Sequence, residues 1–107
     1  MANTFTGVGI TTRAAFDILY TTPASTESIV KSLYFSNHNT GTYYVSATAE
    51  VDGGSTTVYL LNSGRLPPNT TLQVLDGNFV LNAGCELKVY CDQPSSVDAS
   101  ASILEIS

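Results

Sequence analysis

The chain has 107 residues, the length of a single domain, and hydrophobic residues make up 43% of it, enough for one core. Nine acidic residues against four basic ones give a formal charge of −5, which argues against nucleic acid as a partner because phosphate backbones require clustered Lys and Arg. No apolar run approaches the roughly 20 residues of a membrane-spanning helix, so we expect no membrane partner.

Residues 1–13 open the chain, and we expect them to form a flexible arm outside a single β-sandwich domain of residues 14–107. The glycines Gly7 and Gly9 weaken any strand in this segment. The first residues are polar and uncharged, without the basic and apolar regions of a secretory signal, so we expect the chain to start in the cytoplasm in which it is made.

The large apolar residues of this arm are Phe5, Val8 and Ile10. An arm of this kind gains order by lying on a neighbouring subunit, where burial of a large apolar side chain contributes roughly 1.5–3 kcal/mol. We therefore interpret these three side chains as candidate interface residues and expect a homo-oligomer.

Short strands separated by turns are predicted for the rest of the chain. Alternating apolar and polar residues over 42–51 are typical of a half-buried antiparallel strand. The predicted strands span residues 15–21, 27–36, 42–51, 56–62, 71–75, 79–81, 85–91 and 97–106. The predicted turns and connections lie at 37–41, 52–54, 65–69, 76–77, 82–84 and 92–96. About seven or eight short strands at this spacing indicate an all-β fold, an antiparallel β-sandwich that is immunoglobulin-like or jelly-roll-like.

Two cysteines, Cys85 and Cys91, share one face of a predicted strand and lie about 20 Å apart if that strand is extended. A disulfide needs Cα atoms within about 7 Å, so we expect no bridge between them. Their spacing matches no zinc pattern, and His38 is the one histidine of the chain, so we expect two buried thiols and no metal.

Catalytic machinery is not evident in the sequence, and we expect no enzyme and no cofactor. His38 lies in a polar turn, and no motif for a nucleophilic serine or a phosphate loop occurs. The acidic pairs Glu50/Asp52 and Glu86/Asp92 lie on predicted outer faces or turns. Asp52 and Asp76 each precede glycine, so turn chemistry explains both without calcium.

Tyrosines are the more informative polar residues because an outward tyrosine is a good anchor for a protein interface. Tyr43 and Tyr44 are adjacent on a predicted strand and must face opposite ways, with Tyr44 outward. Tyr90 lies on the outward face of the strand that carries the cysteines. Tyr44 and Tyr90 therefore join the candidate interface residues.

Three stretches, residues 22–37, 66–75 and 80–89 with the closing 102–106, resemble small β-sandwich virion proteins of tailed bacteriophages, including phages of cyanobacteria and other marine bacteria. The shared pattern begins with a strand ending in Ser/Ala-Asn and a proline-centred loop into a strand. It continues with a leucine, two residues, then Gly-Asp/Glu-x-Leu-x-Val, and a closing Leu-Glu-Ile. The chain departs from it at Cys85, where an acidic residue is usual, although Glu86 follows at once. The resemblance implies a structural part of the particle without catalytic residues.

The resulting hypothesis is a capsid decoration (cement) protein located in the virion, with other virion proteins as partners: the major capsid protein, or neck or tail proteins. An alternative is a neck, tail or baseplate accessory protein. An alternative of another class is a carbohydrate-binding module for host attachment. Such a module needs an exposed aromatic platform, and the absence of Trp and the scattered tyrosines count against it.

Overall fold

The computed structural model describes residues 3–12, 15–93 and 97–107, without the side chains of Asp52 and Asp76. Parts of the expected arm (residues 1, 2 and 13) and of the 92–96 loop therefore lie outside the described residues. The described residues form eight strands: β1 (Asn3–Thr11), β2 (Asp17–Thr21), β3 (Glu27–Asn37), β4 (Tyr43–Val51), β5 (Thr56–Leu66), β6 (Thr71–Leu81), β7 (Glu86–Cys91) and β8 (Val97–Ile106). One turn of 3₁₀ helix, η1 (Asp52–Gly54), joins β4 to β5.

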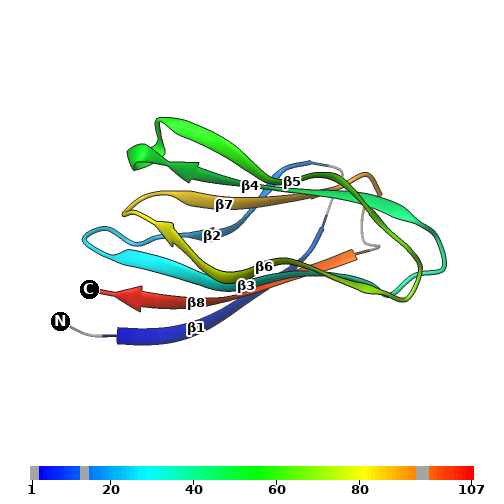
Figure 1. Ribbon diagram of the computed structural model, residues 1–107, viewed down its shortest axis with the longest axis horizontal. Helices are drawn as coiled ribbons and strands as arrows, with labels where there is room; N and C mark the ends of the chain where they lie inside the picture. The colour runs from blue at the N-terminus through cyan, green and yellow to red at the C-terminus, as the bar shows by residue number, and fades with distance from the viewer. Residues whose placement is uncertain (1–2, 13–14, 94–96) are drawn as a thin grey trace.

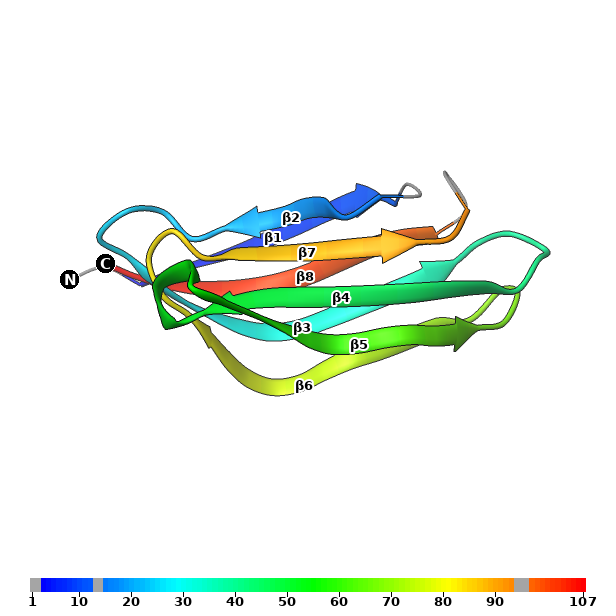
Figure 2. The ribbon, with the colours of Figure 1, turned by 90° about the horizontal axis from the view of Figure 1, so that it is seen from above.

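The strands form two four-stranded sheets, in the orders β1–β8–β3–β6 and β2–β7–β4–β5. Every pairing is antiparallel. The two sheets lie one above the other in Figure 1, and the view from above in Figure 2 places β1 and β2 along the same side of the sandwich. The predicted antiparallel β-sandwich is confirmed.

The strand order also decides between the two predicted kinds of sandwich. β1 pairs with β8, β2 with β7, β3 with β6 and β4 with β5, so the chain is one long hairpin folded over into two layers. This wrapping of eight strands into two sheets is the jelly roll. Both termini consequently lie at the same end of the molecule, where Asn3 pairs with Ile106.

Alternating side chains from both sheets fill the core, as expected from the period of two in a strand. Among the described residues, the largest fully enclosed side chain of this core is that of Phe35, which is 0% exposed. The largest apolar members of the core are Phe35, Leu33, Leu66, Leu81, Leu87, Ile103, Val30, Val45, Val89 and Val97. The inward faces predicted for 42–51 and 85–91 are confirmed at Val45, Leu87 and Val89.

The expected arm is a strand in the structure. β1 pairs with β8 from Asn3 to Thr11 without a shift in register, and Val8 and Ile10 pack against the core. Both glycines of β1 lie on its outward side, so the alternating Thr6, Val8 and Ile10 supply the buried contacts. The sandwich therefore includes β1 as an edge strand.

The hairpin predicted at 76–77 is wrong, because β6 continues from Thr71 to Leu81. Val30 pairs with Phe79 and Ser32 with Asp76, so two residues of β6 oppose Lys31 alone. This is a β-bulge, and Gly77, with φ of 143°, supplies the backbone conformation that it requires. An Asp-Gly pair in a strand can make a bulge as readily as a turn.

Asn37, at the end of β3, ties two loops together. Its side-chain amide donates to the backbone oxygens of Gly41 at 2.8 Å, Pro67 at 3.0 Å and Leu66 at 3.2 Å. Its Oδ1 accepts from the backbone N–H of Asn39 at 2.9 Å. These contacts give a structural reason for the asparagine that closes the strand in the sequence pattern above.

Tyr20 joins the two sheets at the end of the sandwich near the termini. Its hydroxyl hydrogen-bonds to Ser28 Oγ at 2.7 Å and donates to Glu105 Oε2 at 2.5 Å. Burial of the ring, with the Glu105 hydrogen bond second, raises the pKa of Tyr20 to about 12 from its ordinary value of 10.0.

This shift predicts a loss of stability at alkaline pH that depends on Tyr20. Above pH 10 the unfolded chain releases the phenolic proton while the folded chain retains it to about pH 12. The stability that this pKa shift contributes is therefore fully present below pH 10, and about 2–3 kcal/mol of it is lost between pH 10 and 12. The free energy of unfolding in urea should fall over this pH range in the native chain and in the exposed control Tyr59→Phe. In Tyr20→Phe it should fall much less, and an unchanged fall in that variant would assign the effect to another group.

Candidate interaction surfaces

Aromatic side chains gather on the outer face of the β2–β7–β4–β5 sheet. Phe16, just before β2, stacks on Tyr90 of β7, with ring centroids 5.1 Å apart and planes at 26°. The same Phe16 ring meets Tyr59 of β5 edge-on, at 6.3 Å and 81°. Phe16 is 43% exposed and Tyr59 58% exposed. We call Phe16, Tyr59 and Tyr90 the aromatic surface.

Small residues on β4 allow these rings to meet. β4 lies between β7 and β5, and its outward residues there are Ser46, paired with Tyr90, and Thr48, paired with Tyr59. Neither side chain is tall enough to separate the rings of the flanking strands. Ser46 and Thr48 are consequently buried although they face away from the core.

A hollow of about 250 Å³ adjoins the aromatic surface, lined by Phe16, Thr48, Thr57, Tyr59 and Lys88. Lys88 Nζ lies 3.4 Å from Glu86 Oε1, so the cation beside the rings already has an anionic neighbour. The hollow offers ring faces, two hydroxyls and one ammonium. This chemistry suits recognition of a partner surface, and it includes no nucleophile with a base beside it.

An apolar row crosses the outer face of the other sheet. Phe5 of β1 pairs with Leu104 of β8, Leu104 with Ile29 of β3, and Ile29 with Val80 of β6. Phe5 is 76% exposed and Val80 50% exposed. The pairs that follow along β1 are small, with Gly7 opposite Ser102. One end of this face is therefore apolar, and the part beside it carries only small side chains.

The structure separates the five residues predicted for an interface. Phe5 lies in the apolar row, Tyr90 in the aromatic surface, and Tyr44 is 45% exposed further along β4. Val8 and Ile10 do not lie free for a neighbour, because they face inward and pack against the core. Phe16 and Tyr59 were not expected. Their meeting depends on the strand order, which leaves no mark in the local sequence.

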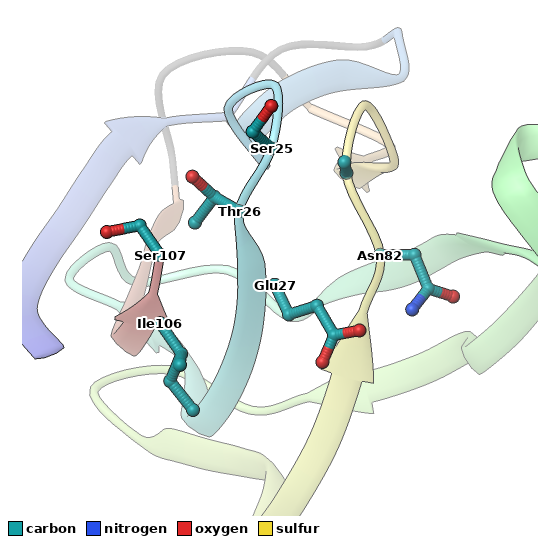
Figure 3. Close-up of a pocket in the computed structure, with 7 residues that line it drawn as sticks. Ser25, Thr26, Glu27, Asn82, Ile106 and Ser107 are labelled. Carbon is teal, nitrogen blue, oxygen red and sulfur yellow. The ribbon is translucent and has the colours of Figure 1, made fainter. Parts of the chain in front are cut away.

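A third feature is an open depression of about 620 Å³ at the end of the sandwich near the termini (Figure 3). Its walls come from the β2–β3 connection, the turn after β6 and the end of β8. The lining residues are Ser25, Thr26, Glu27, Asn82, Ala83, Ile106 and Ser107. Glu27 is the one charged side chain among them, so the depression holds no pair of groups for acid–base chemistry.

Groups that could bind a metal ion lie apart in the described part of the chain. Among the described residues, no three of His, Cys, Asp and Glu cluster around a common point. His38 lies at the surface with its Nε2 3.5 Å from Asp98 Oδ2, and Asp98 also accepts a hydrogen bond from Thr11 Oγ1. The side chains of Asp52 and Asp76 lie outside the described part of the chain. No helix in the described part is long and apolar enough to cross a membrane.

Both cysteines are free and buried in the core. Burial is the main cause that raises the pKa of the Cys91 thiol. We expect thiol titration with a coloured disulfide reagent to find almost no reactive group in the native chain and two per chain in denaturant. Two reactive thiols in the folded chain, or none after unfolding without reductant, would contradict this arrangement.

Comparison with known proteins gives structural likenesses only. No protein-family model matches the sequence, and no curated protein matches it. The crystal structure of the T13 particle of infectious bursal disease virus superposes with a TM-score of 0.61 and 10% identity, covering 96% of this chain and 30% of that one. The VP2 subviral particle of the same virus superposes with a TM-score of 0.56 and 14% identity, covering 96% of this chain and 32% of that one.

A pilus protein is similar as well. The Bacillus endospore appendages described as disulfide-linked pili give a TM-score of 0.56 at 11% identity, covering 99% of this chain and 87% of that one. The chain spans about a third of the length of the capsid proteins and most of the length of the pilus protein. At these identities the likenesses show a shared fold.

Proposed function

We propose that this chain is a non-enzymatic structural component of a tailed-phage virion, and specifically a capsid decoration protein that stabilises the particle through protein–protein contacts. The observation that carries the proposal is the aromatic surface of Phe16, Tyr59 and Tyr90. Exposed aromatic side chains are the typical anchors of protein interfaces. Tyr59 and Tyr90 lie on strands β5 and β7, and Phe16 lies just before β2.

Two further observations support this function. The jelly roll recurs in viral capsid domains, and two of the similar structures come from capsids, although fold alone does not determine function. The charge of −5 disfavours adhesion to nucleic acid released around a particle.

Binding to a lattice needs little affinity from each copy. Neighbouring copies on a shell raise the effective concentration of each contact, so a small aromatic anchor suffices where a single isolated contact would be weak. We propose that the aromatic surface faces the major capsid protein.

The test is to measure whether the chain sediments with purified virions of the phage that encodes it, and at what ratio to the major capsid protein. A decoration protein should be present in a fixed ratio to that protein. A few copies per particle would favour the alternative, a neck, tail or baseplate accessory. Absence from purified virions would overturn both.

Matched variants test the surface itself. Tyr59→Ser removes an exposed anchor of the aromatic surface, and we expect it to weaken binding to virions that lack the chain by tenfold or more, the scale of an interface hot spot. Val80→Ser, which removes a 50% exposed side chain from the opposite sheet, is the control and should bind normally. Equal loss in both variants would place the contact elsewhere.

The aromatic surface also favours a second function, a carbohydrate-binding module for host attachment. Phe16 and Tyr59 line the hollow that Lys88 and two threonines share, so rings and polar groups meet in one place. Jelly rolls also occur in lectin domains. Glycan-array binding that Tyr59→Ser abolishes, together with absence from the capsid, would support this function over the first.

A further inference from the structure

Two edges bound each sheet, and three of these four edge strands carry features that prevent pairing with another chain. Short length, charged residues and bulges are the usual devices. β2 has five residues and a shift in register. β5 and β6 each have irregular register and a charged residue, Arg65 and Asp76 respectively.

β1 has none of these devices. Its nine residues, Asn3–Thr11, include no charged residue and no proline, and its register against β8 is continuous. It runs along the outside of its sheet in Figure 1. In a chain with a charge of −5, this edge is neutral, so a second copy meets no like charge on it.

The open backbone groups of β1 can be identified. The N–H of Thr12 donates to Val97 O of the strand beside it, at 2.8 Å. Backbone groups alternate in direction along an antiparallel strand. The N–H and C=O groups of residues 3, 5, 7, 9 and 11 therefore point away from β8, toward the free edge.

We propose that β1 pairs in antiparallel fashion with β1 of a second copy of this chain, about a two-fold axis at Gly7. In this register Gly7 opposes Gly7, Phe5 opposes Gly9 and Asn3 opposes Thr11 of the second copy. All of these residues belong to the open set, so each opposed pair exchanges two hydrogen bonds. The two sheets become one continuous sheet of β6–β3–β8–β1 and its copy.

The side chains match this register as well. Phe5 is 76% exposed in the single chain, and in the pair its ring lies across from Gly9 of the second copy. An aromatic ring opposite a strand glycine covers the backbone that glycine leaves bare. At the axis, a Cβ on Gly7 would meet no atom within 4 Å, so no other group of the same chain covers the outer face of β1 at this point.

A second copy fits this edge better than an unrelated strand. The contact is isologous: Phe5 of each copy covers Gly9 of the other, so one sequence satisfies both halves. This pairing goes beyond the proposed function and does not depend on it, because it is expected of the purified chain in solution.

The test is the mass of the purified full-length chain by sedimentation velocity over a concentration series. The native chain should show a dimer that dissociates on dilution. Gly7→Lys and Gly7→Glu each place like charges opposite one another at the axis, and each should be a monomer. An equimolar mixture of the two should again form a dimer. Gln73→Lys, with the same added charge on the exposed part of edge strand β6, should dimerise as the native chain does.

Amide hydrogen exchange tests the same register without substitution. At high concentration the amides of Phe5, Gly7 and Gly9 should gain protection, and on dilution they should lose it. The amides of Thr6 and Val8, which face β8, should stay protected throughout. A native chain that remains a monomer, a dimer that persists in Gly7→Lys, or protection of the open amides that does not change with concentration would overturn the proposal.

Discussion

Phe35→Ala is expected to destabilise the chain by about 3–5 kcal/mol, the usual cost of removing a buried aromatic side chain. Phe35 is 0% exposed, and it lies on β3 between Ala99 of β8 and Leu72 of β6. The alanine beside it cannot expand to fill the space, so a cavity should remain. Thermal unfolding followed by circular dichroism should show a midpoint lower by about 12 °C or more.

Tyr34→Ala is the matched control, because Tyr34 is the adjacent aromatic residue of β3 and faces outward. It is partly exposed, so its removal should cost clearly less than the removal of Phe35. Equal losses of stability in the two variants would contradict the placement of Phe35 in the core and of Tyr34 on the outer face.

Periodicity made the buried faces of β4 and β7 predictable. Val45 and Val89 follow a strict period of two, and such a pattern leaves one face for the core whatever strand lies beside it. β1 differs from the arm predicted for it. Two glycines outweighed the alternation of Thr6, Val8 and Ile10, and only the position of β8 shows that a partner strand was available.

The bulge in β6 and the aromatic surface could not be predicted for different reasons. Asp76-Gly77 is compatible with both a turn and a bulge, and the pairing with β3 decides between them. Phe16, Tyr59 and Tyr90 lie far apart in the sequence. They meet because β2, β7, β4 and β5 are neighbours in that order, so the surface is a property of the topology.

Deletion of residues 2–12 is expected to unfold the chain or to lower its stability by about 3 kcal/mol or more. The deletion removes the packing of Val8 and Ile10 against the core and the whole ladder between β1 and β8. It also turns β8, with the buried Ala99 and Ala101, into a new edge. Thermal unfolding of the truncated chain should show a midpoint far below that of the full chain, or no cooperative transition.

Phe5→Ser separates the strand from its exposed side chain. The Phe5 ring is 76% exposed, so its removal should change the unfolding midpoint by little while β1 stays in place. A truncated chain that melts within a few degrees of the full chain would instead support the free arm first expected from the sequence. The comparison is decisive because an edge strand and an arm differ in one respect: the free energy of an edge strand appears in folding, whereas that of an arm appears only on assembly.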